Sequence, residues 1–219
     1  MTGGLYNPRP VDDTPMNGQL EHGVTSNWAY DHSIDIDAHM EDMLSQCLVG
    51  QYFFGESGFH SAGMALAINT LFAVPFYVVR TMTFDRIGFY ANGDAGVGSL
   101  GRCGIYADNG NLYPGALVVD GGVIDLDDAG VKAAVIDQQL TKGLYYKAIL
   151  VDTDPTPRCH NVHVPPLGSA SPQLLNINTL YSVAFGYAAL PAAFPGGAAL
   201  GSIGTREAPS IGLRVASLD

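Results

Sequence analysis

Met82-Thr-Phe-Asp-Arg-Ile-Gly-Phe-Tyr90 is the stretch that decides the fold class. Its apolar side chains fall on alternate positions, first at Met82 and Phe84 and then at Ile87 and Phe89. An alternation of period two is typical of a β-strand that buries one face. The alternation slips by one residue at positions 85–86, which predicts a β-bulge inside this strand.

The segments on both sides also have the pattern of strands. Aromatic and β-branched residues are concentrated between turn residues, at 68–79, 100–106, 116–120, 131–140, 144–151 and 211–215, and the pattern resumes at 174–187. Pro75 indicates that the first of these segments is an edge strand or a strand with a break, because proline has no N–H to donate to a neighbour.

Turn residues separate the predicted strands. They are Asp108-Asn-Gly-Asn111, Pro114-Gly115, Gly121-Gly122, 127–130 and Lys142-Gly143, with longer loops at 152–172 and 191–197. Many short strands with turns at this spacing are typical of sandwiches and jelly rolls. We therefore expect a mainly β fold, an antiparallel jelly-roll-like β-sandwich, over residues 50–219.

The first 49 residues have a different composition. Pro8, Pro10 and Pro15 favour an extended arm, and residues 37–49 place apolar side chains at helical spacing. Asp37 can cap that short helix, which is too short to be stable alone. We expect this region to attach the protein to partners or to form an oligomer, through Trp28, Tyr30, His32, Met40, Met43 and Leu44.

Composition excludes several functions. Only 14% of the residues are charged, and the net charge is −11, so no basic surface is expected to bind nucleic acid. No apolar run is long enough to span a bilayer, and the amino terminus lacks the features of a signal peptide. Three widely spaced cysteines, at positions 47, 103 and 159, are expected to be free thiols.

Two clusters offer metal-ligand side chains, but neither has a spacing that preorganises a metal site. The first consists of His32, Asp35, Asp37 and His39, where the i, i+4 histidine pairing is missing. The second consists of Cys159, His160 and His163 on the predicted long loop. We interpret the first as polar contacts to neighbouring chains and the second as solvated loop residues. No cofactor is expected.

A third cluster suggests a sugar contact. Asp108, Asn109 and Asn111 present oxygens at alternating positions, but the closing glutamate of a calcium loop is absent, so turn chemistry explains them. Exposed aromatic rings can stack on a pyranose, which makes Trp28, Tyr106 and Tyr113 candidates. Tyr113, beside the turn, is the one we expect to be exposed.

Catalytic patterns are weak. Gly55-Glu-Ser-Gly58 lacks the spacing of a nucleophile elbow. Asp125, Asp127 and Asp128 lie in a predicted turn, where aspartate is common for conformational reasons. We expect a protein that is not an enzyme.

Several blocks of the sequence resemble virion proteins of tailed bacteriophages. One is Val11-Asp-Asp-Thr-Pro15 with Thr25-Ser-Asn-Trp-Ala-Tyr-Asp-His32. Another, within 73–151, contains Ala73-Val-Pro-Phe-Tyr-Val78, Gly104-Ile-Tyr-Ala-Asp-Asn-Gly110 and Lys142-Gly-Leu-Tyr-Tyr146, and is similar to the β-sandwich of fibre and host-recognition proteins. The run Ala189-Leu-Pro-Ala-Ala-Phe-Pro-Gly-Gly197 resembles the ends of such proteins.

The resemblance implies a homotrimeric appendage of the virion that is assembled in the host cytoplasm with other virion proteins. It also implies possible contact with the host surface, but it transfers no functional residue. A second hypothesis is a carbohydrate-binding module for host surface polysaccharide, with contacts at Asp108, Asn109, Asn111 and Tyr113. A third, an enzyme that degrades polysaccharide, would need facing carboxylates that the sequence does not require.

Overall fold

In the part of the chain that the computed structural model describes, the strands form three antiparallel sheets and there is no helix. That part comprises residues 47–55, 59–61, 63–93, 95–161, 167, 178–204 and 207–218. These residues therefore hold no helical segment able to cross a membrane. The mainly β class and the antiparallel pairing are confirmed.

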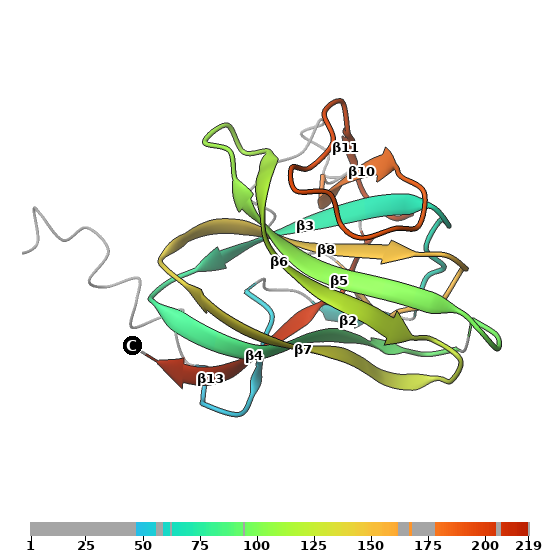
Figure 1. Ribbon diagram of the computed structural model, residues 1–219, viewed down its shortest axis with the longest axis horizontal. Coiled ribbons are helices and arrows are strands. Elements are labelled where there is room, and N and C mark those ends of the chain that lie inside the picture. The colour runs from blue at the N-terminus through green and yellow to red at the C-terminus, as the bar shows by residue number, and fades with distance from the viewer. Residues whose placement is uncertain are drawn as a thin grey trace, which may run out of the picture. The chain divides into compact units, whose positions relative to one another are not determined.

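One sheet has four strands in the order β1-β13-β4-β7 and lies at the bottom of Figure 1. Its interior strand β4 is the segment whose interrupted alternation predicted a strand with a bulge, and Met82, Phe84, Ile87 and Phe89 are all buried. The bounds are β1 (Tyr52–Phe53), β13 (Gly212–Leu218), β4 (Met82–Ala91) and β7 (Gly130–Leu140).

The predicted bulge in β4 is confirmed. The pairing of β4 with β7 shifts register between Phe84 and Arg86. On the other side, Arg86 pairs with Arg214 of β13 while Phe84 pairs with Val215, so Asp85 has no partner in β13. The extra residue returns Ile87 to the buried face of the sheet.

A second sheet has six strands in the order β11-β10-β3-β8-β5-β6, and a small third sheet has the order β12-β9-β2. The bounds of the six are β11 (Ala199–Gly201), β10 (Leu180–Ala184), β3 (Thr70–Val78), β8 (Gly143–Val151), β5 (Leu100–Asp108) and β6 (Pro114–Asp125). Those of the three are β12 (Glu207–Pro209), β9 (Cys159–Asn161) and β2 (Phe59–Ser61).

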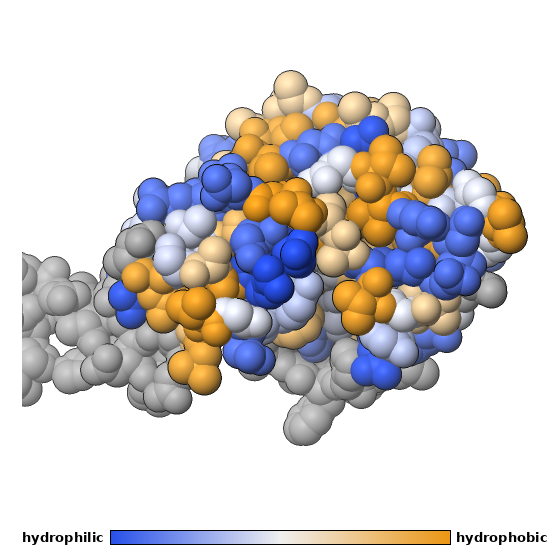
Figure 2. Space-filling model, turned by 60° about the horizontal axis from the view of Figure 1, so that its bottom comes forward, coloured by the Kyte–Doolittle hydropathy of each residue, from blue (hydrophilic) through white to orange (hydrophobic). Residues whose placement is uncertain are grey.

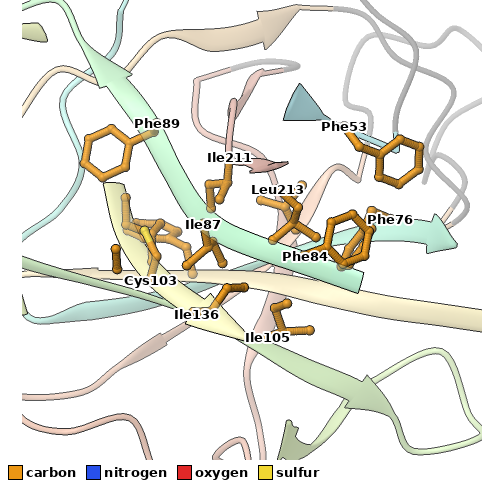
Figure 3. Packing of buried hydrophobic residues seen from close by; sticks show 14 of the residues in the cluster. Phe53, Phe76, Phe84, Ile87, Phe89, Cys103, Ile105, Ile136, Ile211 and Leu213 are labelled. Atoms are coloured by element: carbon orange, nitrogen blue, oxygen red, sulfur yellow. The ribbon is translucent and has the colours of Figure 1, made fainter. Parts of the chain in front are cut away.

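The two larger sheets face each other across one hydrophobic cluster (Figure 3). Phe84 and Ile87 of the four-stranded sheet lie in it with Phe76 and Ile105 of the six-stranded sheet. Burial of these side chains supplies the main stabilising free energy of the fold, at roughly 25 cal/mol per Å² of apolar surface.

A second cluster covers the opposite face of the six-stranded sheet. Tyr106 and Tyr146 lie there beneath Leu190 and Phe194, which belong to the loop after β10. That loop is held to β6 by hydrogen bonds from Leu117 N to the Ala192 carbonyl and from Phe194 N to the Gly115 carbonyl, each 2.9 Å. The six-stranded sheet is therefore covered on both faces.

Three local predictions were wrong or incomplete. Gly121-Gly122 is not a turn but a bulge within β6, where Gly122 has a φ of 85° and its N–H donates to Asp120 Oδ1 over 2.8 Å. The predicted loop at 152–172 contains strand β9. Pro75 lies in an interior strand, but β10 pairs only with Thr70–Ala73, so its neighbour has ended at that point.

The expected arm and most of the expected helix at 37–49 lie outside the described residues. Cys47–Asp219 forms one compact unit by itself. The first residues of this unit already contact the four-stranded sheet, because Gly50 N donates to the Val215 carbonyl over 2.8 Å.

Candidate functional site

The outer face of the four-stranded sheet is the surface opposite the main core. Because side chains alternate along a strand, the residues between the buried ones point outward here. Figure 2 brings the bottom of Figure 1 forward and shows hydrophobic residues scattered among hydrophilic ones on the side it displays. We use "outer face" for Tyr52 of β1, Gly212 and Arg214 of β13, Arg86, Gly88 and Tyr90 of β4, and Val131, Ala133, Val135 and Asp137 of β7.

Small residues line up across three strands of the outer face. Gly212 pairs with Gly88, and Gly88 pairs with Ala133. A Cβ atom at Gly88 would collide with the Lys132 carbonyl oxygen and with Ala133. At Gly212 it would lie 3.0 Å from Tyr52 and 3.1 Å from Phe54. Because the two glycines have no side chain and the alanine has only a methyl group, the backbone forms the floor of a depression here.

A groove of about 370 Å³ occupies this depression. Aromatic side chains form its walls, namely Tyr52, Phe54 and Tyr90, and Val131 lies at its side. The Arg158 guanidinium stacks on Tyr90, with its carbon 4.2 Å from the ring centroid. A concave, mostly apolar site with a few polar groups is the usual form of a binding site.

Two arginines stand side by side next to the groove. Arg86 and Arg214 are cross-strand partners, a like-charge pairing that is unfavourable on its own. The bulged residue Asp85 compensates for it. Arg214 donates two hydrogen bonds to the Asp85 carboxylate, one of them from Nε to Oδ1 over 2.8 Å. These hydrogen bonds from Arg214 hold the pKa of Asp85 below its usual range.

Exposed valines continue the outer face along β7. Val131 and Val135 are 70% and 71% exposed, and Ala133 lies between them. Tyr90 is the direct cross-strand partner of Val131. Together with the groove, these side chains make an apolar surface beside a positively charged one, which is the composition of a surface that binds another molecule.

A buried serine–histidine pair lies behind the groove. Ser210 lines it, and its Oγ is 2.6 Å from His160 Nδ1. Both side chains are buried, and the His160 ring packs edge-on against Phe54. The interpretation of Cys159 and His160 as solvated loop residues is therefore wrong, because they belong to β9. His163 lies outside the described residues.

The cysteines are free thiols, as expected. Cys103 and Cys159 are fully buried, and desolvation raises the pKa of Cys159 to about 11. Among the described residues, no three side chains of the metal-binding types come together.

The Asp108–Tyr113 turn is built as a closed structure. Gly110 N donates to Asp108 Oδ2 over 2.7 Å, and Asn111 N donates to Asn109 Oδ1 over 2.9 Å. These carboxylate and amide oxygens thus accept hydrogen bonds from backbone N–H groups of the same turn. Asn109 and Asn111 remain exposed.

Tyr113 is half-buried rather than exposed. Its hydroxyl donates to the Pro195 carbonyl over 2.6 Å and accepts from Ala198 N over 3.0 Å. Its ring packs against Tyr181 at a centroid distance of 4.9 Å. Tyr106, another candidate for a sugar platform, is fully buried. These two rings hold the covering loop on the six-stranded sheet.

The aspartates at 125–128 brace two turns. Asp127 Oδ1 accepts hydrogen bonds from Gly98 N over 2.6 Å and from Ser99 N over 3.1 Å. Asp125 Oδ1 in turn accepts from Asp127 N over 2.8 Å. The turn therefore uses two of these three carboxylates. Three residues of the Gly55–Gly58 motif lie outside the described residues.

The structure does not place the assembly residues predicted in the first 46 positions. The predicted assembly and metal-ligand residues that lie outside the described residues are Trp28, Tyr30, His32, Asp35, Asp37, His39, Met40, Met43 and Leu44. What sequence reasoning missed is the groove. The sequence indicated it only through Gly88 and Tyr90, which alternate with the core residues of β4. These two residues therefore lie on its outward side and make that side apolar.

A search of protein-family models found no match to the chain, and no curated protein sequence matches it either.

Proposed function

We propose that this chain is a structural subunit of a tailed-phage particle, a fibre or spike component that assembles with itself and with other virion proteins. The outer face is the observation that carries the proposal. The six-stranded sheet has its own covering loop, whereas Val131, Val135 and the aromatic groove are exposed on the four-stranded sheet. Such a face is suited to contact with another protein.

The finer features of the proposal come from the sequence. They are a jelly-roll-like path of the strands, a homotrimer, attachment through residues 1–49, and a place in the virion after assembly in the host cytoplasm. The resemblance of residues 11–39, 73–151 and 189–197 to virion proteins supports them. The polar side chains also agree with a scaffold role. The Asp127 carboxylate and the Tyr113 hydroxyl both make hydrogen bonds to loop backbone of the protein itself.

The location of the protein tests this proposal. Particles of the phage that encodes the chain would be purified, digested and analysed by mass spectrometry, and labelled with gold-conjugated antibody. We expect a fixed number of copies in every particle and gold at one position on it. A protein abundant in the infected-cell lysate but absent from purified particles would contradict the proposal.

A second candidate, recognition of host surface polysaccharide, is favoured by one observation. The groove has aromatic walls and is lined by Gly88 and Gly212, a composition that can bind a sugar ring. The groove therefore supports a sugar site on the four-stranded sheet rather than at Asp108–Tyr113. A glycan array with purified protein tests it. Binding that survives Tyr90→Ala would exclude the groove, and binding lost in Asn111→Ala would favour the turn.

A further inference from the structure

The outer face has a charge unlike that of the protein as a whole. Three arginines, Arg86, Arg158 and Arg214, lie on it or line its groove, against two carboxylates, those of Asp85 and Asp137, whereas the chain has a net charge of −11. Asp85 accepts the hydrogen bonds of Arg214, and Arg158 Nε donates to the neutral Asn92 Oδ1 over 3.1 Å, so the face keeps a net positive charge. An acidic partner is therefore favoured on this face, since opposite charges guide association and orient the partner.

The sequence that precedes Cys47 is strongly acidic. Residues 1–46 contain eight aspartates and glutamates and one arginine, a net charge of −7. Residues 47–219 contain thirteen acidic and nine basic residues, which leaves −4. The acidic segment also contains apolar and aromatic side chains, among them Trp28, Tyr30 and Met40. Its composition complements both the arginines and the apolar part of the outer face.

The acidic segment is attached at the same sheet. Gly50 N bonds to the Val215 carbonyl, and Val215 N bonds to the Gln51 carbonyl over 3.0 Å. Tyr52 of the edge strand β1 is then the cross-strand partner of Arg214. A chain of 46 residues can extend to roughly 150 Å. A domain of this size has a diameter of about 40 Å, so the segment can reach a neighbouring copy.

We propose that the outer face binds the acidic segment, residues 1–46, of a second copy of this chain. Apolar side chains of the segment cover Val131, Val135 and the groove, and its carboxylates face Arg86 and Arg158. Pro8, Pro10 and Pro15 favour an extended conformation of the segment. Each copy offers one segment and one face, so the contact repeats head to tail and can close a ring. The inference rests on the proposed assembly function and specifies its contact.

The oligomeric state of the full chain is the first test, measured by size-exclusion chromatography with light scattering at one protein concentration. We expect an oligomer for the wild type and a monomer for the double variant Val131→Asp, Val135→Asp. Val97→Asp is the matched control, because Val97 is 96% exposed at the β4–β5 turn and outside the outer face. It should leave the oligomer intact. A wild-type monomer, or a double variant that remains oligomeric, overturns the proposal.

A mixing experiment identifies the two partners of the contact. A chain without residues 1–46 retains the strand pairs and both hydrophobic clusters described above, so it is expected to fold. It has a face but no segment, whereas the double variant has a segment but no face. Each should be monomeric alone, and the mixture should form a one-to-one complex.

Two results would overturn the inference. If the truncated chain is still an oligomer, the contact is between faces and not between segment and face. If the mixture stays monomeric, the segment of one copy does not bind the face of another. Either result leaves the particle analysis untouched, so the failure of this contact can be separated from failure of the virion role. Thermal melts of each variant verify that it is folded.

Discussion

Lys147 Nζ donates a hydrogen bond of 2.6 Å to the carbonyl oxygen of Ile211, across the space between the two large sheets. A second bond of 2.6 Å reaches the Phe54 carbonyl. Lys147 belongs to β8 of the six-stranded sheet, whereas Phe54 follows β1 and Ile211 precedes β13 of the four-stranded sheet. The side chain is fully buried, and its Nζ lies 5.4 Å from the Phe76 ring centroid. This lysine thus joins the sheets at the segments that border the groove.

Replacing Lys147 tests this role. Lys147→Ala should lower the free energy of unfolding by roughly 3 to 5 kcal/mol, because it opens a cavity and leaves one buried and one partly buried carbonyl oxygen without this donor. Lys147→Met should cost less, since it keeps the volume and removes the desolvation cost of the charge. Urea denaturation of the three proteins measures the difference. Equal losses in both variants would show that hydrogen bonding, and not volume, dominates.

Gly88→Ala should destabilise the four-stranded sheet. The new methyl group would overlap the Lys132 carbonyl oxygen and Ala133, both on the neighbouring strand, so the backbone must move. Overpacking of this kind costs about 1 to 3 kcal/mol. Gly186→Ala is the control, because a Cβ there meets nothing within 4 Å. Thermal unfolding compares the two variants, and the same melting temperature for both would contradict the assignment of Gly88.

The Asp85–Arg214 ion pair should make stability depend on pH in the acid range. The pKa of Asp85 is lowered in the folded protein, so its stabilising contribution is complete above the ordinary aspartate pKa of about 4. The contribution is lost as the pH falls below that value and through the lowered pKa. Denaturation of the wild type and of Asp85→Asn at a series of pH values measures it. The difference in stability between the two should shrink toward acid pH, and a constant difference would argue against the pair.

Only one of the three thiols should react readily in the folded protein. Cys103 and Cys159 are fully buried, and burial raises the pKa of both. Cys47 is partly exposed, although burial raises its pKa as well. Because the thiolate is the reactive form, a colorimetric thiol reagent should modify about one equivalent quickly and the other two on unfolding. Cys47→Ser, as a control, should abolish the fast phase, and two fast equivalents would contradict the burial of Cys103 or Cys159.

The sequence predicted the regular part of the fold well. The alternation at Met82–Tyr90 located β4 and its bulge, because a strand with one buried face must place its apolar residues two apart. The turn predicted at Gly121-Gly122 was wrong, since paired glycines occur in turns and in bulges alike. Strand β9 was missed because three residues in a proline-rich stretch are too few to show a period.

The candidate site could not be predicted, because it is assembled from distant parts of the chain. Tyr52, Tyr90 and Arg158 meet only after β1, β4 and the segment before β9 have come together. Tyr113 shows the opposite error. Its place next to a turn indicated exposure. The loop after β10 instead packs over its ring, and the Tyr113 hydroxyl donates a hydrogen bond to the Pro195 carbonyl of that loop.

The sequence by itself determined the class of fold and the outer face of β4. Residues two apart lie on one face of a strand whatever the strand packs against, so Gly88 and Tyr90 had to lie opposite Ile87 and Phe89. Only the tertiary structure decided which faces are covered. Burial depends on what is packed above a side chain. The loop after β10 covers one face of the six-stranded sheet, and the other face packs against the four-stranded sheet, to which Lys147 joins it. The same Tyr90 that the pattern placed outward became a wall of the groove only when Arg158 was brought onto its ring.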